Sequence, residues 1–124
     1  MNIKILIPVF NDFESVSKLI NNINSVISNL NGEFSIFVVN DASTDKAEID
    51  ISNISNIKSI KIINMKENRG HARCNAAGLK YIFENEEFDY VIPMDGDGED
   101  RPEEIKEFIE KINNSNGKPI VGER

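Results

Sequence analysis

Four carboxylates lie within six residues of one another in the stretch VIPMDGDGEDRPEEI, which spans residues 91–105. They are Asp95, Asp97, Glu99 and Asp100, and they follow an apolar run that is typical of a buried strand. Two like charges about 4 Å apart repel by about 1 kcal/mol in water and by about 4 kcal/mol at an effective dielectric near 20. The stretch is therefore either a fully solvated acidic loop or a site that holds a cation.

Asp95 and Asp97 form a D-x-D pair, so their side-chain oxygens can converge on one hard cation. Magnesium and manganese favour carboxylate oxygens and keep positions for water and for a substrate phosphate. Gly96 and Gly98 leave room for a ligand beside the backbone. The alternative interpretation is a solvated acidic loop that precedes the next helix.

The rest of the chain supplies the elements that must position these carboxylates. Apolar runs predict strands at residues 4–9, 34–39, 57–65 and 90–94, with a further strand starting at 119–121. Apolar residues three and four apart predict helices at 13–30, 71–83 and 102–112. Strands that alternate with helices indicate an α/β fold with a mostly parallel sheet.

Two of the predicted helices carry more detailed signals. Asp12 is the expected N-cap of the first helix, and Asn31-Gly32 is expected to end it. In the second helix, one face gathers apolar residues: Ala72, Ala76, Leu79 and Phe83. Cys74 is expected to pack near the sheet, and close helix–sheet packing would explain Gly78 inside the helix.

Polar clusters follow each of the first four predicted strands. They are residues 10–12, 40–45, 68–71 and 95–100. Ligands of parallel α/β sheets bind beyond the carboxyl ends of the strands. The clusters therefore predict one shared site, with four unrelated surface turns as the alternative.

Composition narrows the class of protein. The chain has 124 residues, which predicts a single domain over 1–124. Its net charge of −7 argues against nucleic acid as a partner, because such binding needs Lys and Arg to neutralise phosphates. The single cysteine, Cys74, fits a reducing compartment, and no apolar run is long enough for a membrane span. We expect a cytoplasmic location, which includes the inner face of the membrane.

Five motifs occur in an order and at spacings that resemble family 2 glycosyltransferases, which are inverting enzymes with a GT-A fold. They are ILIPVFND, VVNDASTD, NRGHARCNAAGL, DGDGEDRPEEI and GER, and together they cover residues 3–124. The fourth resembles most closely the form found in polyprenyl-phosphate (dolichol- or undecaprenyl-phosphate) sugar transferases. The resemblance implies a three-layer α/β/α, Rossmann-like GT-A sheet, without the C-terminal part of the usual domain.

The resemblance also implies roles for individual residues. Pro8 and Phe10 would line the nucleobase pocket, and Asp41 would accept a hydrogen bond from the base. Gly70 and Arg73 would border the nucleotide, with Arg73 or Arg69 near phosphate.

A second group of implied roles concerns the metal. Asp95 would face the ribose and a divalent cation, Mn²⁺ or Mg²⁺, and Asp97 would hold that cation. The cation would bridge the pyrophosphate and stabilise charge on the departing nucleoside diphosphate. Asn40 stands where many members have another Asp.

The predicted function is transfer of a sugar, with inversion, from a UDP- or GDP-linked donor to an acceptor. A polyprenyl phosphate or a cell-surface glycan is the expected acceptor, which suggests cell envelope glycan biosynthesis and a lipid-linked or membrane-surface partner. No residue matches the family's general base, so we identify no catalytic residue here and expect the base in the C-terminal part.

Two other functions stay open. One is a non-catalytic module that binds nucleotide or metal, and the other is a phosphatase-like hydrolase that uses Asp95 as nucleophile. The exposed edge of a half-sheet also predicts self-association into a homo-oligomer.

Overall fold

The computed structural model of the chain describes residues 1–44, 49, 54–95 and 102–114. Within these residues, four parallel strands form one sheet in the order β3-β2-β1-β4. The strands are β1 (Asn2–Val9), β2 (Glu33–Asn40), β3 (Ser59–Asn64) and β4 (Tyr90–Pro93). All four predicted strands are confirmed to within about two residues, and the fifth, at 119–121, lies outside the described residues.

In the described part of the chain, three α-helices connect or follow these strands, and one short 3₁₀ helix follows the first of them. They are α1 (Phe13–Val26), η1 (Ile27–Asn29), α2 (His71–Asn85) and α3 (Glu103–Asn114). None of the helices in the described part of the chain is long and apolar enough to cross a membrane.

The first helix begins as predicted but ends earlier. The side chain of Asp12 accepts a hydrogen bond from the backbone N–H of Ser15 at 3.3 Å, which confirms the N-cap. The expected end near Asn31-Gly32 is wrong, because the helix tightens into η1 and Leu30 is extended. Ser28 Oγ donates to the carbonyl of Ser25 at 2.8 Å, so side chains in this segment compete for carbonyl oxygens that a longer helix would need.

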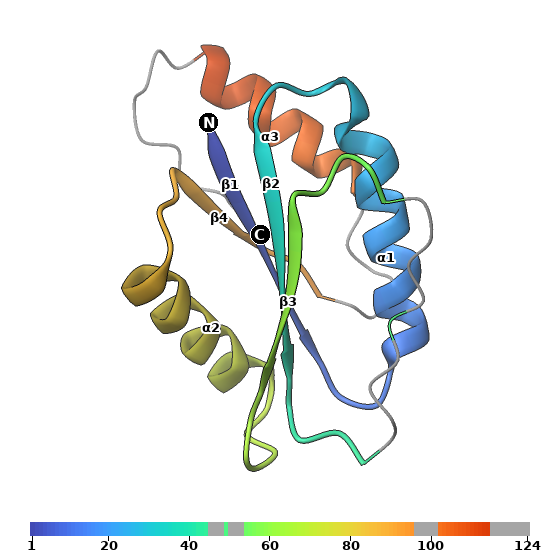
Figure 1. The fold of residues 1–124 in the computed structure, drawn as a ribbon, viewed down its shortest axis with the longest axis vertical. Helices are drawn as coiled ribbons and strands as arrows, with labels where there is room; N and C mark the ends of the chain where they lie inside the picture. Colours follow the sequence, from blue (N-terminus) through green and yellow to red (C-terminus); the bar gives the residue numbers. More distant parts are fainter. Residues whose placement is uncertain (45–48, 50–53, 96–101, 115–124) are drawn as a thin grey trace.

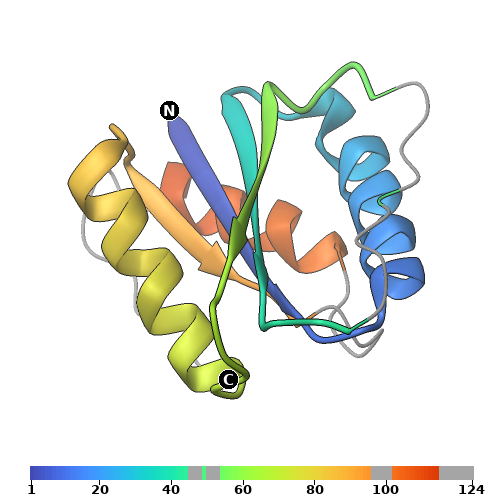
Figure 2. The ribbon, with the colours of Figure 1, turned by 60° about the horizontal axis from the view of Figure 1, so that its bottom comes forward.

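The helices cover both faces of the sheet. Figures 1 and 2 show α1 and α3 on one face and α2 on the other. Along β1, Ile3, Ile5 and Ile7 pack with the α1–α3 layer, whereas Leu6 packs with Phe37 beneath α2. A central strand that is buried on both faces needs a continuous apolar run, which β1 has over residues 5–9. The structure is therefore the predicted three-layer α/β/α arrangement.

The apolar face predicted for α2 lies away from the sheet, whereas the predicted packing of Cys74 and Gly78 near the sheet is confirmed. Ala72 and Ala76 are exposed, and Leu79 and Phe83 are 45% and 78% exposed. The buried residues of α2 are instead three positions spaced four apart: Cys74, Gly78 and Ile82. Small side chains at two of these positions let the helix backbone approach the sheet closely.

Gly78 allows the closest part of this approach. A Cβ built at this position would lie 2.4 Å from Cδ1 of Leu6 and 3.0 Å from Cγ2 of Val39, both of which belong to fully buried side chains. Helix propensity alone favours Ala over Gly by about 1 kcal/mol. We expect the overpacking to outweigh this preference, so that Gly78→Ala lowers the free energy of unfolding by about 1–2 kcal/mol in urea titrations. Ala76→Gly on the exposed face is the matched control and should lower it by about 1 kcal/mol; a more stable Gly78→Ala would contradict the packing argument.

Candidate functional site

The loops after β1 and β2 are fastened to one another at the carboxyl edge of the sheet. Asn11 Nδ2 donates to Thr44 Oγ1 at 3.1 Å, and Asn11 Oδ1 accepts from the backbone N–H of Thr44 at 2.8 Å. The backbone N–H of Asn11 donates to Ser43 Oγ at 2.9 Å. Asn11 and Ala42 both have positive φ, 61° and 55°, which is unusual for an alanine and marks a turn held by its surroundings.

Asn40 joins the ends of β2 and β3. Its Nδ2 donates to Asn64 Oδ1 at 3.0 Å, and its Oδ1 accepts from the backbone N–H of Ser43 at 3.1 Å. The side chain therefore both donates and accepts, which a carboxylate could not do. This is a structural reason for Asn at a position where the resembling family often has Asp.

Asp41 fastens the β3–α2 loop to the end of β2. Its Oδ1 accepts from the backbone N–H of Arg69 at 2.7 Å, and its Oδ2 accepts from that of Gly70 at 2.9 Å. The thiol of Cys74, in the first turns of α2, is a further hydrogen-bond partner. Asp41 is only 1% exposed, so these contacts replace nearly all of its hydration.

The same contacts decide the charge of Asp41. Burial alone would raise the pKa of this carboxyl group, but the N–H groups of Arg69 and Gly70, the thiol of Cys74 and the charge of His71 together lower it below its ordinary value. Asp41 is therefore ionised at neutral pH. A carboxylate has about four acceptor positions, and three donors within the chain occupy most of them, which leaves about one for a ligand N–H.

Cys74, in contrast to Asp41, is held in its protonated, uncharged state. Burial raises the pKa of its thiol to about 12 from an ordinary value of 9.0, and the hydrogen bond to Asp41 and the negative charge of Asp41 add to this effect. A group whose pKa is raised by folding stabilises the protein fully below its unfolded pKa and loses that contribution as the pH rises through the folded value. We therefore expect the free energy of unfolding to fall between about pH 9 and pH 12.

Two measurements check this prediction for Cys74. The native protein should react with a thiol reagent at pH 8 far more slowly than the protein in urea, because the thiolate is the reactive form. Cys74→Ser keeps a donor for Asp41 but does not titrate, so its stability should fall less between pH 9 and 12. Fast modification of the native protein would show that the thiol is neither buried nor held protonated.

The start of α2 carries the next group of predicted residues. Gly70 has a φ of 86°, which favours glycine, and it directly precedes the helix. Arg73 is exposed on the first turn, which contains no acidic residue, whereas exposed Arg69 pairs with Glu67 at 2.7 Å. The positive end of a helix with no acidic residue in its first turn favours a bound anion.

His71 is a site residue that the sequence did not single out. As the first residue of α2 it resembles an ordinary helix-start residue, but its Nδ1 lies 4.0 Å from Oδ1 of Asp95, directly beyond β4. The only signal in the sequence was that both residues follow predicted strands. The structure thus brings the β3 and β4 ends together as well.

A divalent cation is compatible with what is described here. Carboxylate oxygen and imidazole nitrogen are donors that Mn²⁺ accepts, and Asp95 and His71 present one of each at 4.0 Å. The second carboxylate of the predicted pair, Asp97, lies outside the described residues. Among the residues that the structure does describe, no group of three or more His, Cys, Asp or Glu side chains converges.

Pro8 and Phe10 lie at different depths. Pro8 is buried in β1 opposite Val39, and Phe10 follows the strand with its side chain 41% exposed. Phe10 therefore presents an aromatic ring at the same edge of the sheet as Asp41. Such a ring can stack on a planar ligand.

The model of the glycosyl transferase family 2 matches residues 4–124. The chain belongs to this family. An uncharacterised glycosyltransferase from Synechocystis is 31% identical over 112 residues, which are 90% of this chain and 34% of that protein.

Solved structures agree on the fold of this family member. Residues 1–349 of TarS from S. aureus match with a TM-score of 0.65 and 21% identity, over 94% of this chain and 33% of that one. A structure of the same TarS region in complex with UDP matches with a TM-score of 0.65 and 20% identity, over 98% of this chain and 38% of that one. These matches show the GT-A fold, and the chain spans about a third of the length of the relatives that it matches.

Proposed function

We propose that this family 2 chain is the donor-binding part of a glycosyltransferase and that it holds the nucleoside diphosphate of a nucleotide sugar. The observation that carries the proposal is the joining of all four strand ends into one edge, through Asn11 to Thr44, Asp41 to Gly70 and His71 to Asp95. Ligands of parallel α/β sheets bind at such an edge. The UDP complex of the TarS neighbour supports a uridine nucleotide as the first ligand to test.

Each described side chain has a role in this proposal. The exposed ring of Phe10 stacks on the base, and the remaining acceptor position of Asp41 receives a base N–H. The N-terminus of α2, with Arg73 on its first turn, faces the phosphates. Arg69, on the loop before α2, remains paired with Glu67.

Asp95 and Asp97 are the residues that would hold a divalent cation, with His71 beside them. Such a cation, when bound, acts as a Lewis acid that stabilises negative charge on the departing nucleoside diphosphate. Because the pKa of Asp41 is lowered, its carboxylate stays ionised, and able to accept a hydrogen bond from the base, across the pH range in which the enzyme would work.

The full reaction also needs an acceptor and a general base that activates it. An inverting transfer needs a general base on the acceptor hydroxyl, and we propose that this base lies in a part of the protein that the matched third does not cover. A polyprenyl phosphate at the cytoplasmic face of a membrane is proposed from the acidic motif DGDGEDRPEEI alone, and the relatives found do not support that subtype. A cell-surface glycan is the other acceptor proposed.

The test is a calorimetric titration of the chain with UDP and with GDP, each in Mn²⁺ and in chelator. We expect binding of UDP that weakens by about a hundredfold or more in chelator, because the cation links carboxylate and pyrophosphate. Tighter binding of GDP than of UDP would make guanine the preferred base and would leave the proposed site unchanged. Absence of binding of either nucleotide to a protein that unfolds cooperatively would overturn the proposal.

A second candidate is a module that binds the nucleotide without turnover. Release of UDP from a UDP-sugar, followed with a coupled assay, separates the two. Tight UDP binding with no release would favour the binding module. Phosphate release from an aryl phosphate would instead indicate the hydrolase.

A further inference from the structure

The thiol of Cys74 lies against the carboxylate that is proposed to bind the base. Cys74 is fully buried in the first turns of α2, where its backbone N–H donates to the carbonyl of Gly70 at 3.1 Å. Its thiol donates a hydrogen bond to the side chain of Asp41. Burial raises the pKa of this thiol to about 12, so at neutral pH it keeps its proton and remains a donor. Cys74 therefore occupies part of the acceptor capacity of Asp41.

Three donors leave Asp41 with about one acceptor position. Its Oδ1 accepts from the backbone N–H of Arg69 at 2.7 Å and its Oδ2 from that of Gly70 at 2.9 Å, so each oxygen has used one of its two positions. The thiol of Cys74 takes one of the two positions that remain. Within the described part of the chain, no other hydrogen-bond donor contacts this carboxylate. Because Asp41 is 1% exposed, water has little access to the last position.

Nucleobases differ in the number of N–H groups that they can present to such a carboxylate. Uracil presents a single ring N–H between two carbonyl groups. Guanine presents a ring N–H and an amino group side by side, and this pair binds both oxygens of a carboxylate at once, as an arginine side chain does. That pairing needs a free position on each oxygen of Asp41, and the thiol of Cys74 leaves only one in total. One guanine N–H would be left without an acceptor, which costs affinity in a site with little water.

We propose that Cys74 is a positioning residue that sets the base specificity of the nucleotide site. By occupying one acceptor position of Asp41, it restricts the site to bases with a single ring N–H, which is the pyrimidine-dione class of uracil, and it disfavours guanine. Cys74 does not contact the nucleotide and acts only through Asp41. The inference rests on the proposed function, because it names the substrate class of the site that is proposed there.

A preference for uracil over guanine can also arise from size, because guanine is the larger base. A limit set by size does not depend on the thiol, whereas a limit set by acceptor positions disappears when the thiol is removed. Cys74→Ala removes the donor, and Cys74→Val removes it while filling the space that the thiol occupied. Cys74→Ser keeps a donor at the same position. These three variants therefore separate hydrogen bonding from space.

The experiment is a calorimetric titration of the chain and its variants in Mn²⁺ with UDP, with GDP and with a UDP whose uracil N3 carries a methyl group. The natural chain should bind UDP at least about tenfold more tightly than either of the others, since a hydrogen bond to a charged group changes affinity by about this factor or more. In Cys74→Ala and Cys74→Val, the preference for UDP over GDP should fall by about tenfold, because guanine then finds a position on each oxygen. Cys74→Ser should keep the preference of the natural chain.

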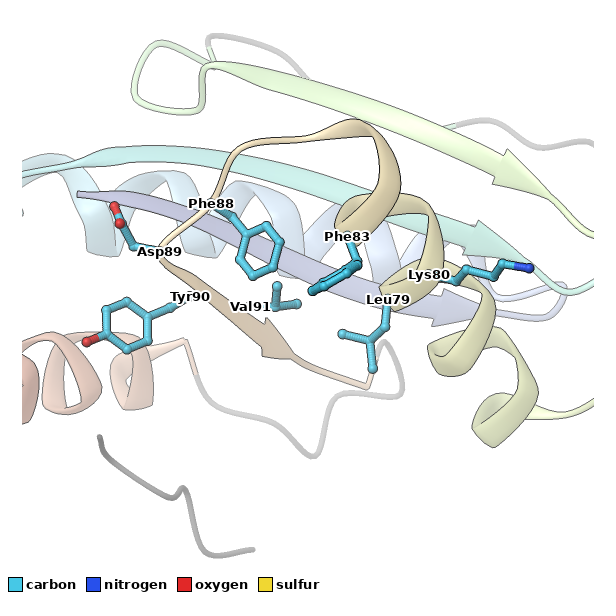
Figure 3. A pocket seen from close by; sticks show the side chains of 7 residues that line it. All are labelled: Leu79, Lys80, Phe83, Phe88, Asp89, Tyr90 and Val91. Atoms are coloured by element: carbon cyan, nitrogen blue, oxygen red, sulfur yellow. The ribbon is translucent and has the colours of Figure 1, made fainter. Parts of the chain in front are cut away.

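Two substitutions in α2 control for effects that do not involve the thiol. Gly78→Ala is at the next buried position along the same side of the helix, and its added methyl group would meet the side chain of Leu6 first and not that of Asp41. Leu79→Ala lies on another side of the helix, where the side chain lines an apolar groove beside β4 (Figure 3). Both variants should keep the natural ratio of UDP affinity to GDP affinity. A ratio that falls in Gly78→Ala as it does in Cys74→Ala would show that loosening of α2, and not loss of the thiol, relaxes the specificity.

Each failure has a distinct meaning. If the folded chain binds none of the three nucleotides, the proposed function fails and this inference fails with it. If UDP binds but GDP binds as tightly or more tightly, the nucleotide site stands and the assignment of a single-donor base is overturned. A preference for UDP that is unchanged in Cys74→Ala and Cys74→Val would overturn the role of Cys74, because the preference would then come from size. Equal binding of UDP and its N3-methyl form would show that the base N–H does not reach Asp41, and this too would overturn the inference.

Discussion

Replacing Asp41 by Ala is expected to lower the free energy of unfolding by about 3 kcal/mol, since two partly buried N–H groups and a thiol lose their acceptor. The N–H groups belong to Arg69 and Gly70, and Gly70 directly precedes α2. A single domain has about 5–15 kcal/mol of stability, so the variant should remain folded but unfold at clearly lower urea concentration. Nucleotide binding should be lost, because the loop proposed to border the phosphates is no longer fastened to β2.

Asp12→Ala is the matched control for Asp41→Ala. Asp12 also accepts a backbone N–H, from Ser15 at 3.3 Å, but it is exposed and the freed N–H can bond to water. This loss should therefore cost about 1 kcal/mol and leave nucleotide binding unchanged. Equal destabilisation by both variants would show that the burial of Asp41 does not matter.

The pH dependence of Asp41 has a definite sign. Its folded pKa is lowered, so its contribution to stability is present above its unfolded value near 3.8 and is lost as the pH falls through the folded value. The difference in stability between the natural chain and Asp41→Ala should thus shrink in acid. We would measure it from urea titrations between pH 3 and pH 7.

The sequence predicted the strands and the three-layer fold because buried parallel strands are short continuous apolar runs between turn residues. In α2 it showed apolar residues on two sides, and the buried side is the one with smaller side chains, where Cys74 and Gly78 were predicted to pack near the sheet. Cys74 and Gly78 carry little hydrophobic signal, yet they allow the backbone to reach Leu6 and Val39. The larger Leu79 and Phe83 share the apolar face named from the sequence, but they are 45% and 78% exposed.

The sequence predicted which loops form the candidate site, but it did not predict the hydrogen bonds and the ion pair that join them. Polar loops after parallel strands must share an edge, so the four clusters could be brought together by topology. The bond from Gly70 to Asp41 spans 29 residues and depends on a loop conformation that has no periodic signal. For the same reason the approach of His71 to Asp95 could not be found, although both residue types were visible. If Asp41 accepts a hydrogen bond from the base, as predicted, it must do so while it also fastens the β3–α2 loop to β2.

The metal-dependent part of nucleotide binding is expected to depend on Asp95 and Asp97. In Mn²⁺, Asp97→Ala and Asp95→Ala should each weaken UDP binding by about a hundredfold, because a cation that has lost a carboxylate ligand no longer links the chain to the pyrophosphate. With Mn²⁺, His71→Ala should weaken UDP binding less than Asp95→Ala or Asp97→Ala does. With Mg²⁺ its effect should be smaller still, because Mn²⁺ accepts an imidazole ligand better than Mg²⁺ does. Calorimetric titrations of UDP in each metal measure all of these differences.

Chelator completes this comparison as a thermodynamic cycle. If the carboxylates act through the cation, the natural chain and Asp97→Ala should bind UDP equally weakly once the metal is removed, since the substitution then removes nothing that contacts the nucleotide. Glu99→Ala, in the same acidic stretch but outside the D-x-D pair, is the matched control and should behave as the natural chain does in Mn²⁺. A hundredfold loss that persists in chelator would mean that Asp97 contacts the nucleotide directly or supports the fold, and an unchanged affinity in Mn²⁺ would mean that the acidic stretch is a solvated loop.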